Sequence, residues 1–411
     1  MKRKSGAYVK KPNRFLYWLA IKAVYPFLRT KYNVKIDKSE LDGIKAPVLV
    51  LSNHQSNIDF LIAAIALYPI KLNFLVTTYF FHQSQLKWML DTMGCIPKKQ
   101  FIPDVHSIKQ MLAVCERGDS IGIFPEGQVC YTGETCDIDA SIGKLVKKLG
   151  LTTVTVSIRG NHLTMPKWGA GITEIGKVEA KACVMMTSDE ILESSVEEIN
   201  KKIHGALEYN EYEWQRKTMA ECKKGRTAQR LETILHRCPF CGTDFAMQSD
   251  KNILFCEKCG YSVRRNSYGF FEKNCDRDVV FDNPVDWYHM QRDEIEREID
   301  GGKLPFVSKC NVYHTVEGHH GYTLCGEGVM SLDKNGLHMV GDENGRPIES
   351  ITLLERQSNL AHNAPLCAVD IHGEGENYAF EPDDGRKMIK FVEMYACLHK
   401  RNKAEKDQRR H

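Results

Sequence analysis

Short apolar runs alternate with helix-like stretches between residues 48 and 160, and this alternation is the main structural signal in the chain. Apolar runs bounded by Asn, Pro or Gly predict buried strands, whereas apolar residues that recur every three or four positions predict helices. Strands that alternate with helices are typical of an α/β fold with a mostly parallel sheet flanked by helices. The predicted strands are 48–51, 73–76, 121–124 and 154–158, and the predicted helices are 57–67, 83–93, 106–116 and 141–149.

Beyond residue 160 the pattern changes to shorter modules. A polar helical stretch at 190–224 precedes a group of cysteines, and a charged helix is predicted at 286–299. Short segments rich in Val, Tyr and Thr follow at 306–380, and a last amphipathic helix is predicted at 387–398. Several short strands followed by one terminal helix are compatible with a pleckstrin-homology-like barrel.

These changes in pattern divide the chain into successive segments. We predict a basic amphipathic arm (1–35), an α/β domain (36–225), a compact cysteine module (235–275), a helical linker (276–302), a small mainly-β domain with a C-terminal helix (303–402) and a charged tail (403–411).

Charge becomes informative when it is mapped along the chain. The 411 residues carry a formal charge of +3, but the first 35 contain ten Lys or Arg and no Asp or Glu, so the remainder carries −7. A basic arm on a mildly acidic body predicts an anionic partner, either phospholipid or nucleic acid. A basic N-terminus without acidic residues is also compatible with a mitochondrial transit peptide, although this one is rich in Lys and poor in Ser.

Composition excludes several classes of protein. Apolar residues make up 42% of the chain and charged residues 27%, which is ordinary for a globular protein and unlike a disordered one. No apolar run reaches the roughly 18 residues that a membrane-spanning helix needs. No signal-peptide core follows the basic N-terminus. Fifteen cysteines, an odd number spread along a long chain, predict a reducing compartment.

His54 and Asp59 are the first candidates for chemistry. They lie in the segment Asn53-His-Gln-Ser-Asn-Ile-Asp, directly after the first predicted strand, and ligands bind at such strand ends in α/β sheets. A His is the natural general base near neutral pH, and a carboxylate on one ring nitrogen raises the basicity of the other. The two can meet only if His54 precedes the helix, with Ser56 or Asn57 as its N-cap. An incidental His beside a helix cap is the alternative for this motif taken alone.

Three further blocks follow this motif in order. They are Gly-x-Ile-Pro at 94–97, Phe-Pro-Glu-Gly at 124–127 and the apolar strand at 154–158. With the Asn-His-x-x-x-x-Asp motif, they resemble the glycerophospholipid acyltransferase family, of which 1-acylglycerol-3-phosphate O-acyltransferase is the best-known member. The resemblance covers about residues 48–160 and implies the α/β fold of that family.

The resemblance also implies a reaction. A fatty acyl group would pass from a thioester, acyl-CoA or acyl carrier protein, to the hydroxyl of a lysophospholipid. His54 would remove the hydroxyl proton and Asp59 would orient His54. The activated hydroxyl would attack the thioester carbonyl directly, without an acyl-enzyme. Glu126 and Gly127 would help to hold the acceptor head group.

The phosphate-binding positions depart from the family pattern. The family commonly continues Phe-Pro-Glu-Gly with Thr-Arg, where this chain has Gln128 and Val129, and its middle block usually ends in Arg, where this chain has Gln100. Lys98 and Lys99 supply positive charge there, as point charges rather than bidentate forks. A solvated basic turn is the alternative for these two. The acceptor is then 1-acyl-glycerol-3-phosphate or another lysophospholipid. The Phe-Pro-Glu-Gly-x-Val form of the block resembles remodelling members of the family such as tafazzin.

Residues 15–28 of the arm are amphipathic and aromatic. Tyr17, Trp18 and Tyr25 suit the headgroup level of a bilayer. A basic segment of this kind lies in a membrane interface rather than spanning it, and Pro26 is expected to end or kink the helix. The alternative is a first helix that packs on the core behind a basic leader. We predict a peripheral membrane protein on the cytoplasmic face.

Cys238, Cys241, Cys256 and Cys259 form two Cys-x-x-Cys pairs with fourteen residues between them. This spacing is typical of a four-thiolate zinc site and resembles a zinc ribbon. A redox dithiol is the alternative, and two matched pairs favour structural Zn²⁺. The charges of the module are mixed, so no nucleic acid is expected as a partner.

These features together predict a membrane-associated acyltransferase of phospholipid biosynthesis with an appended zinc ribbon. Its expected partners are the phospholipid surface, a lysophospholipid acceptor, and acyl-CoA or acyl carrier protein as donor. The competing class is a membrane-associated adaptor on an inactive acyltransferase fold, which would bind a partner through the ribbon. The intact pair of His54 and Asp59 favours the enzyme. Because the two Arg residues that are common in the family are absent, the adaptor remains an alternative.

Overall fold

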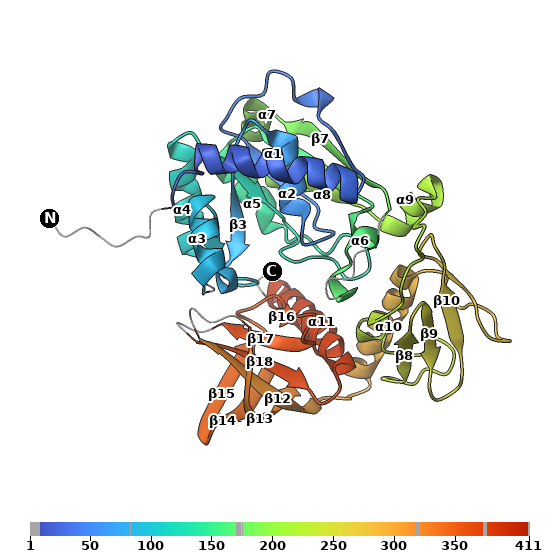
Figure 1. Ribbon diagram of the computed structural model, residues 1–411. Helices are drawn as coiled ribbons and strands as arrows, with labels where there is room; N and C mark the ends of the chain where they lie inside the picture. Colours follow the sequence, from blue (N-terminus) through green and yellow to red (C-terminus); the bar gives the residue numbers. More distant parts are fainter. Residues whose placement is uncertain are drawn as a thin grey trace. The chain divides into compact units, whose positions relative to one another are not determined.

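The chain divides into two compact units, each with its own sheets and core (Figure 1). The computed structural model describes residues 9–82, 84–169, 174, 176–316, 321–372 and 376–409. The first unit comprises Met1–Lys99, Asp104–Pro166 and Ile175–Glu221, and the second comprises Gln100–Pro103, Lys167–Glu174 and Cys222–His411.

A seven-stranded sheet forms the centre of the first unit, in the order β1-β7-β6-β2-β5-β3-β4. Strands β6 and β7 pair antiparallel, and the other neighbours pair in parallel. The prediction of a mostly parallel sheet is therefore confirmed. The strands are β1 (Val34–Asp37), β2 (Leu49–Ser52), β3 (Leu72–Thr77), β4 (Ile96–Lys98), β5 (Ser120–Ile123), β6 (Thr153–Arg159) and β7 (Val178–Met186).

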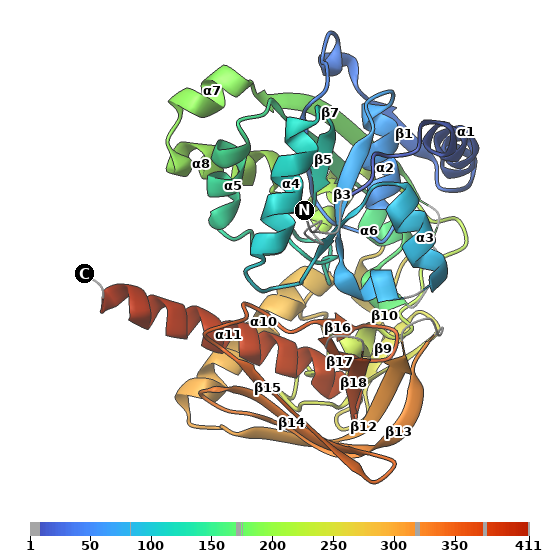
Figure 2. The same cartoon turned by 90° about the vertical axis from the view of Figure 1, so that its left-hand side faces the viewer.

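Helices cover both faces of this sheet (Figure 2). The helices described in this unit are α1 (Arg14–Lys31), α2 (Asp59–Leu67), α3 (Ser84–Thr92), α4 (Val105–Glu116), α5 (Ser141–Leu149), α6 (Asn161–Thr164), α7 (Ser188–Glu193), α8 (Val196–Leu207) and α9 (Glu211–Thr218). Helices α1 and α2 pack on one face, and α4, α5 and α8 on the other. The chain around β2 supplies both cores, because Val48 and Val50 belong to the first and Leu49 and Leu51 to the second.

Helix α1 does not end at Pro26. It continues through Pro26 to Lys31, so the expectation that this residue ends the helix is wrong, whereas a kink at Pro26 stays a prediction. A proline inside a helix leaves a carbonyl one turn earlier without its usual donor. Beyond this point, the Thr30 hydroxyl donates a hydrogen bond to the Pro26 carbonyl oxygen at 2.8 Å.

One face of α1 is in the core and the other is in solvent. Tyr17 and Leu28 are buried, and they belong to the core beneath α2. This is the packing helix that was the alternative for the segment. Large apolar side chains nevertheless stay exposed elsewhere on the helix, namely Phe15, Trp18, Leu19 and Phe27. Throughout the described part of the chain, no helix combines the length and apolar character that crossing a bilayer requires.

The second unit contains two antiparallel sheets, a small one in the order β11-β10-β9-β8 and a seven-stranded one in the order β15-β14-β13-β12-β18-β17-β16. The predicted mainly-β C-terminal domain with a terminal helix is thus present. The small sheet contains β8 (Met247–Asp250), β9 (Ile253–Cys256), β10 (Ser262–Arg265) and β11 (Phe271–Lys273). The larger one contains β12 (Phe306–Val316), β13 (Thr323–Leu332), β14 (Gly336–Glu343), β15 (Arg346–Leu353), β16 (His362–Asn363), β17 (Ala368–His372) and β18 (Glu376–Pro382).

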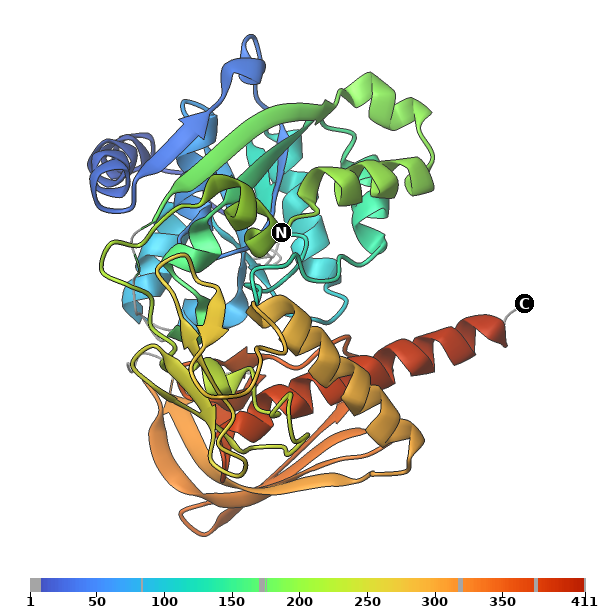
Figure 3. The ribbon, with the colours of Figure 1, turned by 90° about the vertical axis from the view of Figure 1, so that its right-hand side faces the viewer.

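Helix α11 (Arg386–Gln408) packs on the larger sheet and is crossed by α10 (Pro284–Asp300) (Figure 3). Helix α11 extends through most of the segment that we predicted as a charged tail. Helix α10 also packs on the small sheet, because the Trp287 ring lies 6.2 Å from that of Tyr261 and 5.8 Å from that of Phe271. The charged helix of the predicted linker is thus part of the core of this unit.

A buried ion cluster joins the cysteine module, α10 and α11. Lys390 is 5% exposed, and its Nζ lies 2.6 Å from both Asp244 Oδ2 and Glu298 Oε2. Burial acts to raise the pKa of Asp244, but the neighbouring His236 side chain and the Lys390 ammonium hold that pKa well below its ordinary value. The cluster is stabilising only while the cation and both carboxylates are together.

We expect Lys390→Met to weaken α10 locally by less than the roughly 3–5 kcal/mol of a fully broken buried pair, because Asp244 and Glu298 lose one cation but keep Arg237, whose Nη1 lies 2.9 Å from Asp244 Oδ1 and 3.8 Å from Glu298 Oε1. Hydrogen exchange of the α10 amides in the whole protein measures this change. Lys406→Met is the matched control, since Lys406 pairs with Glu355 at the surface, where an ion pair contributes at most about 1 kcal/mol. Equal protection of α10 in the two variants would contradict the role of the cluster.

Candidate active site

The loop that follows β2 is held on the end of β6. The Asn53 side chain donates a hydrogen bond from Nδ2 to the Ile158 carbonyl oxygen, and its Oδ1 accepts one from the Ile158 N–H, both at 2.7 Å. This pair of bonds continues the pairing of β2 with β6 beyond the last residue of the strand. His54, the next residue, therefore leaves the sheet at a fixed point on its carboxyl edge.

The structure brings His54 and Asp59 together. Nδ1 of His54 lies 3.0 Å from Oδ2 of Asp59, and the same oxygen accepts hydrogen bonds from the backbone N–H of Gln55 and Ser56 at 2.6 and 2.8 Å. Asp59 is the first residue of α2, whose N-cap is Ile58 without a capping side chain. The expectation that Ser56 or Asn57 caps this helix is thus wrong, because the Asp59 carboxylate itself reaches back to the loop.

Asp59 is fully buried and accepts four hydrogen bonds, the fourth from Asn161 Nδ2 to Oδ1 at 2.5 Å. The carboxylate is therefore fixed in one orientation. With Nδ1 directed at a carboxylate, Nε2 is the ring nitrogen of His54 that can take up a proton. Among the described residues, Nε2 makes no hydrogen bond, and the His54 side chain is 20% exposed.

The Phe-Pro-Glu-Gly block contacts His54 from two sides. The Phe124 ring stacks on the His54 ring with centroids 4.2 Å apart. Glu126, 5% exposed, accepts a hydrogen bond from the His54 backbone N–H at Oε1 (2.6 Å) and from the Cys136 N–H at Oε2 (2.7 Å). Burial raises the pKa of Glu126 to about 8, against the lowering effect of these two bonds. Both oxygens therefore hold backbone, whereas the resemblance implied a contact with the acceptor head group.

Gly127 and the two lysines are more open to solvent. Gly127 turns the chain at φ +67°, a conformation that favours glycine, and it is exposed. Lys98 ends β4 and is half-buried, and burial lowers its pKa. Its Nζ donates to the carbonyl oxygen of Lys99 at 2.5 Å, while the Lys99 side chain is exposed.

The lysines share an edge of the sheet with His54 but do not contact it. Strands β2, β5, β3 and β4 are parallel neighbours, so their carboxyl ends lie along one edge. Three strand spacings separate β2 from β4, a distance of about 14 Å. A ligand that touched both would have to extend along this edge.

Sequence reasoning missed Asn161 and Glu211. Asn161 begins α6 directly after β6, and Gly160 before it has φ +79°. The buried Glu211 accepts hydrogen bonds from the backbone N–H of Gly160 (3.0 Å) and Leu163 (2.9 Å), which fixes the turn that carries Asn161. The available signal was a Gly-Asn pair at the carboxyl end of the last predicted strand.

The four cysteines of the module form one cluster in the second unit. Their Sγ atoms lie within 4.8 Å of one another, with 3.7 Å between Cys238 and Cys259 and 3.9 Å between Cys241 and Cys256. A tetrahedral zinc ion with bonds of about 2.3 Å separates its sulfur ligands by about 3.8 Å. The donor set and its spacing are therefore compatible with Zn²⁺.

Comparison with known proteins finds a family model and relatives that match part of the chain. Residues 31–159 match a family model described as Acyltransferase. The chain is 27% identical over 164 residues to a chloroplastic 1-acyl-sn-glycerol-3-phosphate acyltransferase of Arabidopsis thaliana, LPAT1, across 39% of this chain and 44% of that protein. It is 26% identical over 163 residues to another such chloroplastic enzyme, BAT2 of Brassica napus, across 39% and 46%. These matches span less than half the length of either relative.

The crystal structure of the 1-acyl-sn-glycerophosphate (LPA) acyltransferase PlsC from Thermotoga maritima is also similar, with a TM-score of 0.39, 18% identity, and coverage of 46% of this chain and 78% of that chain. The segment matched by the family model includes His54, Asp59 and Glu126. By this match, residues 31–159 form an acyltransferase domain, and this part of the chain is similar to glycerophospholipid acyltransferases.

Proposed function

We propose that this protein transfers a fatty acyl group from acyl-CoA or acyl carrier protein to the hydroxyl of a lysophospholipid, with 1-acyl-glycerol-3-phosphate as the preferred acceptor. The contact of 3.0 Å between His54 and the buried Asp59 carries the proposal. Two curated relatives are named as 1-acyl-sn-glycerol-3-phosphate acyltransferases, which supports this acceptor.

The proposed chemistry uses His54 as a base and then as an acid. The acceptor hydroxyl gives its proton to Nε2 of His54 while its oxygen forms a bond to the thioester carbonyl carbon. The carbon–sulfur bond then breaks, and the leaving thiolate takes the proton from Nε2. Asp59 holds the ring through Nδ1 and stabilises the imidazolium that forms between these steps.

We assign the acceptor phosphate to Lys98 and Lys99, and a positioning role to Glu126. The lysines lie on the same edge of the sheet as His54, and cations at this edge would attract an anionic head group. Both Glu126 oxygens already accept backbone hydrogen bonds, so Gly127 is the exposed part of that block that could approach the head group.

A lipid substrate also accounts for the exposed apolar residues of α1. Phe15 and Trp18 are exposed on a helix that carries several basic residues and no acidic one. Such a helix can lie in the interface of a bilayer. We therefore propose a peripheral membrane protein on the cytoplasmic face. The four-cysteine cluster is proposed to hold structural Zn²⁺.

Replacing His54 should abolish acyl transfer without unfolding the protein. We expect His54→Ala to lower kcat by about 10²–10⁴-fold, the usual contribution of a general base. The assay uses labelled acyl-CoA or acyl carrier protein with a panel of lysophospholipids in mixed micelles. His106→Ala is the matched control, because His106 is an exposed histidine of the same unit.

Full transfer by the His54 variant would refute the proposed mechanism. If the wild-type protein itself transferred acyl groups from neither donor to any lysophospholipid, the adaptor hypothesis would replace the enzyme.

Glu126→Gln distinguishes a positioning residue from a head-group ligand. The amide nitrogen cannot accept a hydrogen bond, so the backbone N–H of His54 or Cys136 loses its partner. We expect kcat to fall roughly tenfold or more, since an unsatisfied buried group costs about 1–3 kcal/mol. The KM for the acceptor should change little. A raised KM with unchanged kcat would instead indicate a head-group ligand.

Glu126 should also make stability depend on pH. Its pKa of about 8 in the folded protein lies above the ordinary value of 4.5, so the folded state binds this proton more tightly. The resulting stabilisation is complete below pH 4.5 and is lost as the pH rises to 8. Urea denaturation of wild type and Glu126→Gln at both ends of this range should show the dependence in wild type and its reduction in the variant.

Metal removal should unfold the cysteine module locally. We expect one zinc per chain by elemental analysis, and faster hydrogen exchange in β9 and β10 after chelation, because structural zinc supplies folding free energy. Cys256→Ser should reproduce this loss. Cys275→Ser is the matched control, as Cys275 lies in the same module but outside the cluster. Unchanged exchange in metal-free protein would exclude a structural role for the metal.

A further inference from the structure

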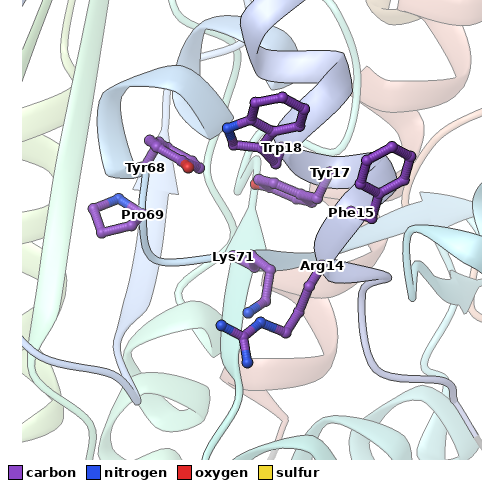
Figure 4. A pocket seen from close by; sticks show the side chains of 7 residues that line it. All are labelled: Arg14, Phe15, Tyr17, Trp18, Tyr68, Pro69 and Lys71. Carbon is purple, nitrogen blue, oxygen red and sulfur yellow. The ribbon is translucent and has the colours of Figure 1, made fainter.

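A basic and aromatic pocket lies between the first turns of α1 and the segment that joins α2 to β3 (Figure 4). Its volume is about 400 Å³, and its lining residues are Arg14, Phe15, Tyr17, Trp18, Tyr68, Pro69 and Lys71. This volume is in the range of pockets that bind small molecules. All seven residues belong to the first unit.

Two cations lie at one end of this pocket. Figure 4 shows the Arg14 and Lys71 side chains extending toward the same end of the pocket, with the Trp18 and Tyr68 rings at the other end. Within the described residues, neither cation has a hydrogen bond or an ion pair, and the first 35 residues contain no acidic side chain. Two cations that line one pocket and have no carboxylate partner favour an anionic ligand.

The rest of the pocket suits an anion that is attached to an apolar body. Phe15 is 65% exposed and Trp18 43%, and their ring centroids lie 6.0 Å apart at the rim. Exposed aromatic residues beside basic ones are typical of proteins that lie at the membrane interface. The buried Tyr17 also lines the pocket, and its hydroxyl accepts a hydrogen bond from the Leu72 N–H at 3.3 Å.

The pocket is separate from the candidate active site. Lys71 precedes the first residue of β3, so the pocket lies at the amino end of that strand, whereas His54 follows the carboxyl end of β2. The two strands run in the same direction in one sheet, and six residues of strand span about 20 Å. A ligand in the pocket is therefore not positioned for acyl transfer.

We propose that Arg14 and Lys71 bind the phosphate of an anionic bilayer phospholipid that is not the substrate, while Phe15 and Trp18 enter the interface beside it. Arg14 would donate two parallel hydrogen bonds to the phosphate oxygens, and Lys71 would add a point charge. The pocket thus recognises a lipid head group and orients α1 on the membrane. This docking function does not require catalysis and can be tested without it.

Vesicle sedimentation with the whole protein tests the proposal. The probes are vesicles of phosphatidylcholine alone and vesicles that also contain phosphatidylglycerol. We expect Arg14→Gln with Lys71→Gln to weaken binding to the anionic vesicles by roughly thirtyfold, since each basic residue near such a surface contributes a factor of about five. His54→Ala should bind like wild type, which separates failure of docking from failure of the proposed chemistry.

Two controls separate a defined site from general attraction. Lys144→Gln with Lys148→Gln removes the same charge from exposed positions on α5, which packs on the other face of the sheet, and should bind nearly as well as wild type. Arg14→Lys keeps the charge but loses the bidentate geometry, and it should weaken binding several-fold.

Several outcomes would overturn the proposal. They are wild-type binding by the pocket double variant, an equal loss in the α5 double variant, and unchanged binding by Arg14→Lys. Complete release from the vesicles by inorganic phosphate at matched ionic strength would also overturn it, because the pocket would then take a soluble phosphate rather than a bilayer lipid.

Discussion

Burial of the Asp59 carboxylate is the constraint on which the geometry of the candidate site depends. A buried carboxylate is costly unless hydrogen-bond donors replace the water it has lost. Here the donors are the backbone N–H groups of Gln55 and Ser56, the Asn161 amide and the His54 ring. Three of the four belong to the loop between β2 and α2. Satisfying the carboxylate therefore shapes this loop, and the orientation of His54 is fixed by folding rather than by substrate.

A second buried carboxylate acts on the same loop from the neighbouring strand. Glu126 follows β5, which pairs with β2 in parallel, so its carboxylate reaches the backbone N–H of His54. Asn161 follows β6, the other neighbour of β2. The order of strands thus explains why blocks far apart in the sequence meet at His54. It also explains why Lys98 and Lys99 do not, because β4 lies at the far end of the sheet.

The pattern of apolar and polar residues predicted the strands and helices whose burial depends on their own sequence. The apolar run at 48–51 and the periodic helix at 141–149 lie within a residue of their positions in the structure, because burial of the strand on both faces and of the helix on one face each leaves a clear pattern. The pairing of His54 with Asp59 could be anticipated from five residues of sequence. The partners of Glu126 could not, since Cys136 and His54 reach it through the sheet and a long loop. Glu211, 50 residues from Asn161 and in another helix, left no local signal.

In the second unit too, contacts between residues far apart in the sequence could not be predicted. Four cysteines predicted a metal-held module, and a module of about 40 residues has too small a core to be stable without such a staple. The sequence did not indicate that Trp287 of α10 would pack against Tyr261 and Phe271 of the small sheet, or that Lys390 of α11 would pair with Asp244. These contacts make the module part of a larger core. A metal at the cysteines would then hold one corner of that core, a role that differs from that of a separately tethered binding module and favours a structural function for the ribbon over an adaptor.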